Sequence, residues 1–152
     1  MILIDLDSSQ TNYNPTSAPN APAGIYTITA TFRNISTATL KDLHFEVTQL
    51  SNNNLLLNAD GGPAGVGAIL SVPPASLGPD EVLSPDETFT IGFEIGLASA
   101  KPFNFFVDAY GVVVDGLSIT SLTEGDSFHF DIDPNAAPAK DGHRYYMPII
   151  VK

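Results

Sequence analysis

Apolar residues recur at every second position in five segments of the chain, and this alternation constrains the fold more than any other feature of the sequence. In residues 25–34, aromatic and aliphatic side chains alternate with threonine and arginine. The other four segments are residues 43–48, 89–95, 103–110 and 128–133. Because successive side chains of a strand point to opposite faces, each segment is expected to be a strand with one buried face. No stretch has a long apolar stripe at helical spacing.

The residue types between these segments also favour strands and turns. Glu, Lys, Gln and Arg, which commonly cover helix surfaces, total 13 of 152 residues, and 12 of the 17 acids are Asp, which favours turns and caps. The pair Asp115-Gly116 predicts a two-residue hairpin connection, and Pro85 predicts a turn over residues 84–87. The sequence therefore predicts an all-β protein.

About nine short strands without crossover helices predict two antiparallel sheets packed face to face. A closed barrel is the alternative, because alternation alone does not separate the two architectures. We divide the chain into an N-terminal strand and Pro-rich segment (1–23), a sandwich core (24–122) and C-terminal strands that complete or extend it (123–152). The first part would hold a strand at Ile2–Leu6, then a linker or a strap along the sandwich edge. The last would hold an edge strand at Tyr145–Val151, which contains Pro148.

The charge and the lengths of the apolar runs argue against several partners. The net charge of −11 repels phosphate backbones and anionic lipids, so no nucleic-acid binding is expected. No apolar run reaches the roughly 18–20 residues that span a bilayer, so no membrane insertion is expected. The opening residues 1–6 are too short an apolar run for a signal peptide. Without cysteine, neither a disulfide nor a thiolate metal site can form.

Two short motifs carry a family resemblance. Arg33-Asn34-Ile35-Ser36 leads into an expected strand, and Leu83-Ser84-Pro85-Asp86 precedes another. With the segments around them, over about residues 24–114, they resemble prokaryotic cell-surface immunoglobulin-like modules of the CARDB and DUF11 kind. This chain departs from that pattern at Asp86, where the family usually has glycine. The resemblance implies an immunoglobulin-like β-sandwich in a secreted or surface protein, acting as a non-catalytic spacer or adhesion module.

The sequence offers no catalytic pattern. His44 and His129 alternate with core residues and should face solvent, and no HxH or HxxxH spacing suits zinc. A G-x-S-x-G elbow and an Asp-Thr/Ser-Gly turn are both missing. The glycines around Pro63 are not followed by the lysine of a phosphate loop. We therefore expect no enzyme activity and no required cofactor.

Calcium is the one inorganic partner that the sequence suggests. Asp5 and Asp7 share one side of the first strand, with Asn12 and Asn14 beyond them. A second group of oxygen ligands consists of Asp131, Asp133, Asn135 and Asp141. Calcium takes six to eight oxygen ligands and would relieve repulsion between paired acids. The alternative interpretation is that these are solvated acids at turns and strand ends.

Two aromatic residues are candidates for ligand binding. Phe106 and Tyr110 point opposite to the apolar set of residues 103–107, so they would share the other face of that strand. Exposed aromatic rings on a sandwich can bind polysaccharide, although this chain has no tryptophan. The alternative is that both rings are covered, by a second packed face or by the C-terminal tail.

The terminal strands suggest self-association. Ile2–Leu6 and Tyr145–Val151 could each pair with a sheet edge of a neighbouring protein or copy, since main-chain hydrogen bonds drive strand addition. The sequence therefore predicts a non-catalytic structural or adhesion module of a secreted or surface-displayed prokaryotic protein. The alternative function is a carbohydrate- or ligand-binding accessory domain of a secreted hydrolase.

Overall fold

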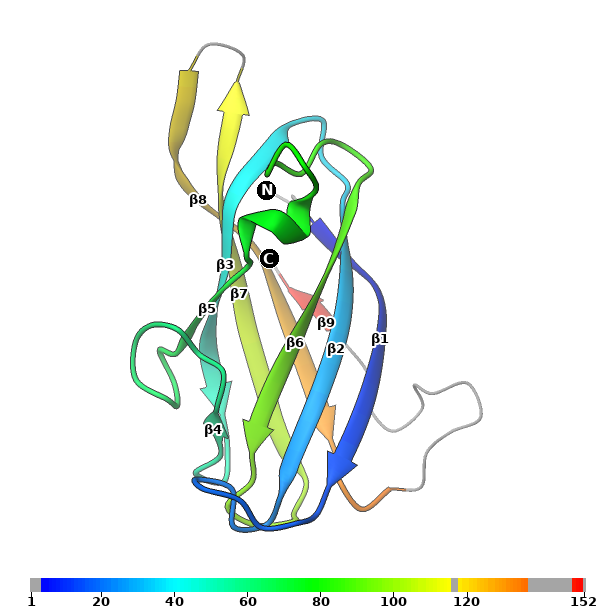
Figure 1. The fold of residues 1–152 in the computed structure, drawn as a ribbon, viewed down its shortest axis with the longest axis vertical. Coiled ribbons are helices and arrows are strands. Elements are labelled where there is room, and N and C mark those ends of the chain that lie inside the picture. Colours follow the sequence, from blue (N-terminus) through cyan, green and yellow to red (C-terminus); the bar gives the residue numbers. More distant parts are fainter. Residues whose placement is uncertain (1–3, 116–117, 137–148, 152) are drawn as a thin grey trace.

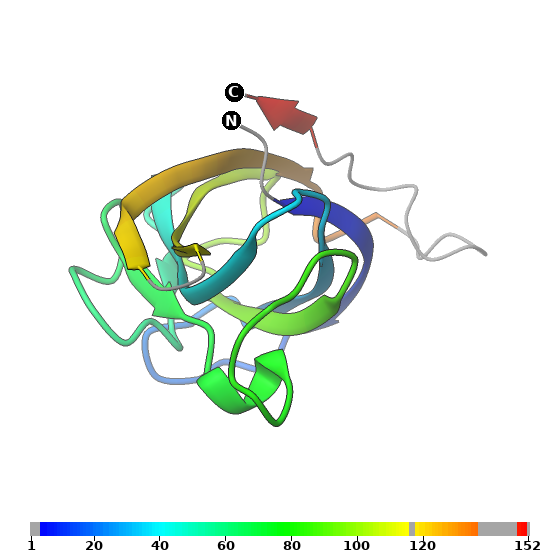
Figure 2. The same ribbon diagram turned by 90° about the horizontal axis from the view of Figure 1, so that it is seen from above.

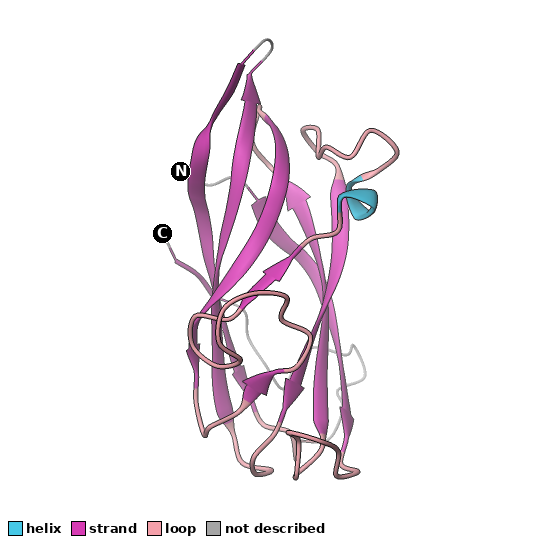
Figure 3. Ribbon diagram, turned by 60° about the vertical axis from the view of Figure 1, so that its left-hand side comes forward, coloured by secondary structure: helices cyan, strands magenta, loops and turns pink. Residues whose placement is uncertain are grey.

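The protein is a β-sandwich with one short helix in the part of the chain that the structure describes. The structure is a computed structural model, and it describes residues 4–115, 118–136 and 149–151. Figure 3 shows how completely strands dominate, with the 3₁₀ helix η1 (Pro74–Leu77) at one end of the molecule. The strands are β1 (Ile4–Asn14), β2 (Ile25–Asn34), β3 (Thr39–Leu50), β4 (Leu55–Leu56), β5 (Ile69–Ser71), β6 (Thr88–Gly96), β7 (Phe103–Asp115), β8 (Ser118–Ile132) and β9 (Ile149–Val151).

The strands form two antiparallel sheets. The four-stranded sheet has the order β1-β2-β6-β4 and the five-stranded sheet the order β5-β3-β7-β8-β9 (Figure 1). The view from above in Figure 2 shows the two sheets facing each other across the core. The predicted all-β two-sheet sandwich is confirmed, and the alternative of one closed barrel is not found.

The strand order is that of an immunoglobulin-like sandwich. Strands β1, β2, β6 and β4 correspond to the A-B-E-D sheet of that fold, and β3, β7 and β8 to its C-F-G sheet. Strand β5 adds to the larger sheet beside β3, and β9 adds to it beyond β8. The extra strand that the sequence predicts at the C-terminal end is therefore the outermost strand of the larger sheet.

Phenylalanine rings from both sheets fill the core. Phe93 of the smaller sheet lies between Phe45 and Phe105 of the larger one, with ring centroids 5.4 and 5.2 Å away in edge-to-face geometry. Phe32 lies 4.9 Å from Phe128 in the same geometry. Less than 2% of each of these residues is exposed. Such pairs add to the free energy of burial, so the alternating apolar positions hold the two sheets together.

The N-terminal strand is longer than predicted. Strand β1 pairs with β2 from Ile4 to Asn14, so the polar residues 7–14 are strand and not linker. A bulge between Leu6 and Ser8 shifts the register, and with it the phase of the inward positions. At the end of the strand, the hydroxyl of Tyr13 donates to the carbonyl of Ala23 at 2.7 Å. This part of the N-terminal segment is an edge strand of the sandwich.

The C-terminal part of the larger sheet is one long hairpin followed by a short strand. Strands β7 and β8 form the predicted hairpin, but Asp115 pairs with Ser118, so its connection lies one position later than expected. Strand β8 runs across the predicted boundary at 122/123, which means that residues 123–132 complete the sandwich. Of the expected strand at Tyr145–Val151, β9 is strand, whereas residues 145–148 lie outside the described part.

Candidate functional site

The outward face of the larger sheet carries two aromatic–histidine pairs. We call this surface the outer face, and it comprises His44 and Glu46 of β3, Asn104, Phe106, Asp108 and Tyr110 of β7, and Ser127, His129 and Asp131 of β8. Antiparallel pairing places Phe106 opposite His129 and Tyr110 opposite His44. All four of these side chains are half-buried. The period of two that puts their neighbours in the core puts these four residues on the outside.

The rings of each pair are stacked. The ring centroids of Phe106 and His129 lie 3.9 Å apart with an interplanar angle of 14°, and those of Tyr110 and His44 lie 5.2 Å apart at 8°. Each aromatic ring therefore turns one flat side toward an imidazole of the adjacent strand. Cross-strand pairs of this kind stabilise a sheet, and they leave less ring surface for stacking against a sugar.

Polar rows separate the two aromatic pairs and flank them. Asp108 lies opposite Glu46 on one side, and on the other it accepts a hydrogen bond from the Ser127 hydroxyl. On the other side of the Phe106–His129 pair, Asp131 accepts a hydrogen bond from the side-chain amide of Asn104. The outer face is therefore acidic as well as aromatic, and two of its carboxylates have partners within the sheet.

The structure places Phe106 and Tyr110 where the sequence predicts, on the face opposite to the core. Sequence reasoning missed their partners, although it placed both His44 and His129 on outward positions. The missing information was the register between strands. It places His44 opposite Tyr110 across β3 and β7, although they are 66 positions apart in the sequence, and Phe106 opposite His129 across β7 and β8, although they are 23 positions apart. Ligand binding by this face stays a prediction.

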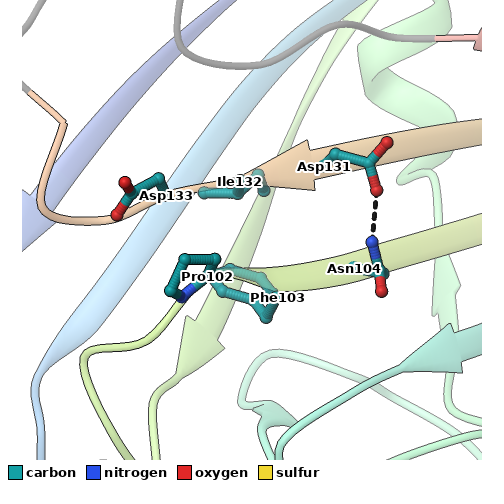
Figure 4. Close-up of a pocket in the computed structure, with 6 residues that line it drawn as sticks. All are labelled: Pro102, Phe103, Asn104, Asp131, Ile132 and Asp133. Atoms are coloured by element: carbon teal, nitrogen blue, oxygen red, sulfur yellow. Dashed lines mark hydrogen bonds between the residues drawn. The ribbon is translucent and has the colours of Figure 1, made fainter.

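Two of the predicted calcium ligands line one pocket at the end of β8. The pocket has a volume of about 400 Å³ and is lined by Pro102, Phe103, Asn104, Asp131, Ile132 and Asp133. Figure 4 shows the Asp131 carboxylate directed at Asn104, while Asp133 lies further along the chain, past the end of the strand. A carboxylate oxygen of Asp133 accepts a hydrogen bond from the backbone N–H of Asn135 at 3.0 Å. The structure thus brings Asp131 and Asp133 to the same pocket.

The other two predicted calcium ligands of this group are Asn135 and Asp141. The side-chain amide of Asn135 donates to the carbonyl of Ala100, which ties the turn after β8 to the segment before β7. Asp141 lies outside the described residues. Within the described ranges, no group of three or more His, Asp, Glu or Cys side chains is arranged to hold a metal. Calcium binding therefore remains a prediction for these residues.

The other predicted pair of calcium ligands lies near an arginine. A carboxylate oxygen of Asp7 is 3.3 Å from Nη2 of Arg33, and Nη1 of Arg33 lies 3.1 Å from a carboxylate oxygen of Asp86. The hydrogen bonds that Arg33 donates to Asp7 and then to Asp86 raise the pKa of Arg33 above its ordinary value. The β1 bulge falls at Asp7, while Asp5 pairs with Arg33 in the register. Arg33 thus offers Asp7 a counter-charge without a metal ion.

The asparagine of the Arg33-Asn34-Ile35-Ser36 motif holds the β2–β3 turn. Asn34 is fully buried, and its side-chain amide donates to the carbonyls of Ala38 and Leu83 at 2.8 and 2.9 Å. Its side-chain oxygen accepts from the backbone N–H and the hydroxyl of Ser36 at 2.9 and 2.7 Å. Since a buried polar group must find partners, these bonds explain why Asn and Ser occur at this spacing.

The second motif forms the turn before β6. Glu87 donates its backbone N–H to the carbonyl of Ser84 at 3.1 Å, and Asp86 has a φ of 72°. Glycine is favoured at this third position of such a turn, since it adopts positive φ without strain. Here Arg33 donates to both the carbonyl and the carboxylate of Asp86, at 2.9 and 3.1 Å. The departure from the family pattern is therefore stabilised by an arginine of the other motif.

Comparison with known proteins identifies no family for this chain. No protein-family model matches the chain, and no curated protein is similar to it. The resemblance to CARDB and DUF11 modules thus remains a prediction from the motifs. Among the described residues, no helix has the length and apolar character needed to cross a membrane.

Proposed function

We propose that this chain is a non-catalytic structural or adhesion module of a secreted or surface-displayed prokaryotic protein, and that copies associate through their terminal strands. One observation carries the proposal: β1 forms one edge of the smaller sheet, and β9 forms one edge of the larger sheet. An outermost strand is where another strand can be added by main-chain hydrogen bonding. Both ends of the described chain therefore lie at sheet edges to which a further strand can be added.

The structural part of the proposal draws on what the motif residues do. The polar groups of Asn34 and Asp86 form hydrogen bonds within turns, and Arg33 links one motif to the other. These roles stabilise a sandwich. They fit the spacer or adhesion role that the motif resemblance implies.

The proposal is tested by light scattering over a concentration series from micromolar to millimolar. The full chain should form oligomers, and deletion of residues 1–7 or of residues 149–152 should weaken them. Thr90→Ala is a matched control, because Thr90 lies on β6, which has strands on both sides. Circular dichroism melts would confirm that each variant folds. A full chain that stays monomeric throughout the series contradicts the proposal.

A second candidate function has one observation in its favour. The outward position of Phe106 and Tyr110 supports a carbohydrate- or ligand-binding accessory domain of a secreted hydrolase. A glycan array with the full chain and with Tyr110→Ala tests it. Binding that is lost in the variant supports this function, whereas no binding by the full chain, or equal binding by both, contradicts it.

A further inference from the structure

Strand β9 has only a short stretch of pairing with its sheet. It has three residues, and they pair with Ser127–His129 of β8. Strand β1, by contrast, is an 11-residue strand that pairs with β2 from end to end. Because main-chain hydrogen bonds accumulate with strand length, β9 is the more easily displaced of the two terminal strands.

The connection to β9 is much longer than the connection between β7 and β8. Residues 133–148, sixteen in all, separate β8 from β9, whereas two residues join β7 to β8. A two-residue connection forces its strands to pair within one chain, and hairpin loops are usually about two to five residues long. Residues 133–136 form a turn in which Asn135 is hydrogen-bonded to the segment before β7, and the other twelve residues of the connection can reach about 40 Å when extended. That length is enough to bring β9 to another molecule.

The pairing edge of β8 is the same in every copy. In the described part of the chain, residues 118–126 of β8 pair with β7 and have no strand on their other side, so the edge extends well past the part that β9 occupies. Through a connection of sixteen residues, β9 meets its own edge at an effective concentration of the order of millimolar. A neighbouring copy held at similar density offers an equal competitor, because exchange replaces each contact with an identical one.

We propose that β9 is exchanged between copies, so that Ile149–Val151 of one chain pair with Ser127–His129 of the next. This inference rests on the self-association proposed above and specifies the strand and the edge that carry it. Reciprocal exchange gives a closed dimer, and exchange in one direction gives an open chain of modules. In both cases the larger sheet keeps the strand order that the structure shows.

Engineered disulfides test which molecule supplies the strand. The native chain has no cysteine, so introduced thiols have no competitors. His129 and Ile149 are directly opposite each other in the register, at the spacing of residues that a cross-strand disulfide can join. His129→Cys and Ile149→Cys are made in separate chains, mixed at high concentration through an unfolding and refolding step, and oxidised. Non-reducing electrophoresis then measures the covalent dimer.

The matched control uses two strands that cannot exchange easily. Thr31 and Thr90 face each other across β2 and β6, with hydroxyl oxygens 2.8 Å apart, and both strands have neighbours on both sides. Mixed Thr31→Cys and Thr90→Cys chains should give little covalent dimer, while the double variant closes its disulfide within one chain. Exchange of β9 predicts roughly tenfold more dimer from the 129 and 149 mixture than from this control. The pair Ser127→Cys and Val151→Cys repeats the test two residues further along the two strands.

The outcomes separate this inference from the proposed function. Covalent dimers from both β8–β9 mixtures support exchange. If the β8–β9 mixtures give no more dimer than the control, exchange is wrong, whether the corresponding double variants close internally or stay reduced. Self-association of the native chain by light scattering would in that case leave the proposed function standing, through another edge. A native chain that is monomeric throughout contradicts both.

Discussion

The two faces of β7 bear aromatic side chains of similar size in different surroundings. On the inner face, Phe105 is fully buried and its ring lies 5.2 Å from Phe93 of the opposite sheet. One residue further along, on the outer face, Phe106 is half-buried and stacks on His129 of the adjacent strand. Inner rings therefore join one sheet to the other, whereas outer rings join strands within one sheet. An aromatic residue that alternates out of the core need not be a ligand site.

The largest effect should come from removing an inner ring. Phe105→Ala leaves a cavity between the sheets and should lower the free energy of unfolding by about 3–5 kcal/mol. Phe106→Ala is the matched control, since it makes the same change one residue away and should cost much less. Urea denaturation of both variants measures the difference. Equal losses would mean that the outer face is as tightly packed as the core.

The next effect concerns Asn34, a polar side chain that is buried at the β2–β3 turn. Asn34→Ala removes both donors to Ala38 and Leu83 and should cost about 2–3 kcal/mol, because the carbonyls are left buried without partners. Asn58 is a matched control, since it also bridges two backbone groups, Gly92 and Glu94, but is partly exposed. Thermal melts of Asn34→Ala and Asn58→Ala compare them. A smaller loss at Asn34 would show that the turn rearranges.

The addition of calcium tests whether Asp131 and Asp133, at the end of the outer face, bind this ion. If Asp131 and Asp133 bind it, calcium at ten times the dissociation constant should stabilise the fold by about 1.4 kcal/mol, as ligand linkage requires. The rise in melting temperature should vanish in Asp131→Asn combined with Asp133→Asn, and persist in Asp7→Asn. A melting temperature that is unchanged at millimolar calcium removes this prediction.

A double-mutant cycle measures how much the Phe106–His129 pair on the outer face contributes to stability. Phe106→Ala, His129→Ala and the double variant should give a coupling energy of about 0.5–1 kcal/mol, the range expected for a stacked cross-strand pair. Denaturant unfolding of all four proteins measures it. A coupling energy of zero would mean that the stacking adds nothing to stability and leaves Phe106 available for another role.

An effect of similar size separates backbone strain from side-chain pairing at Asp86. Asp86→Ala should lower stability by about 1 kcal/mol, because alanine tolerates positive φ poorly and loses the bond from Arg33. Asp86→Gly should fall within about 0.5 kcal/mol of the native chain, since glycine relieves the strain as the exposed ion pair is lost. Chemical denaturation ranks the two. An alanine variant as stable as the glycine variant would show that the turn is not strained.

The sequence predicted most of the fold and part of the candidate site. Alternation alone identified the inward positions of β2, β3, β6 and β7, and all of those residues are buried. It did not identify residues 7–14 as strand, because they are mostly polar and because a bulge near Asp7 interrupts the pairing of β1. It also could not place His129 on Phe106, since that pairing depends on a register that no local pattern encodes.

The amino-acid sequence by itself determined that the chain forms strands, and which side of each strand faces the core, because side-chain polarity and a period of two are local properties. Only the tertiary structure decided which strands are neighbours and which strands lie outermost. Those are contacts between residues far apart in the chain, and they depend on how whole sheets pair and pack.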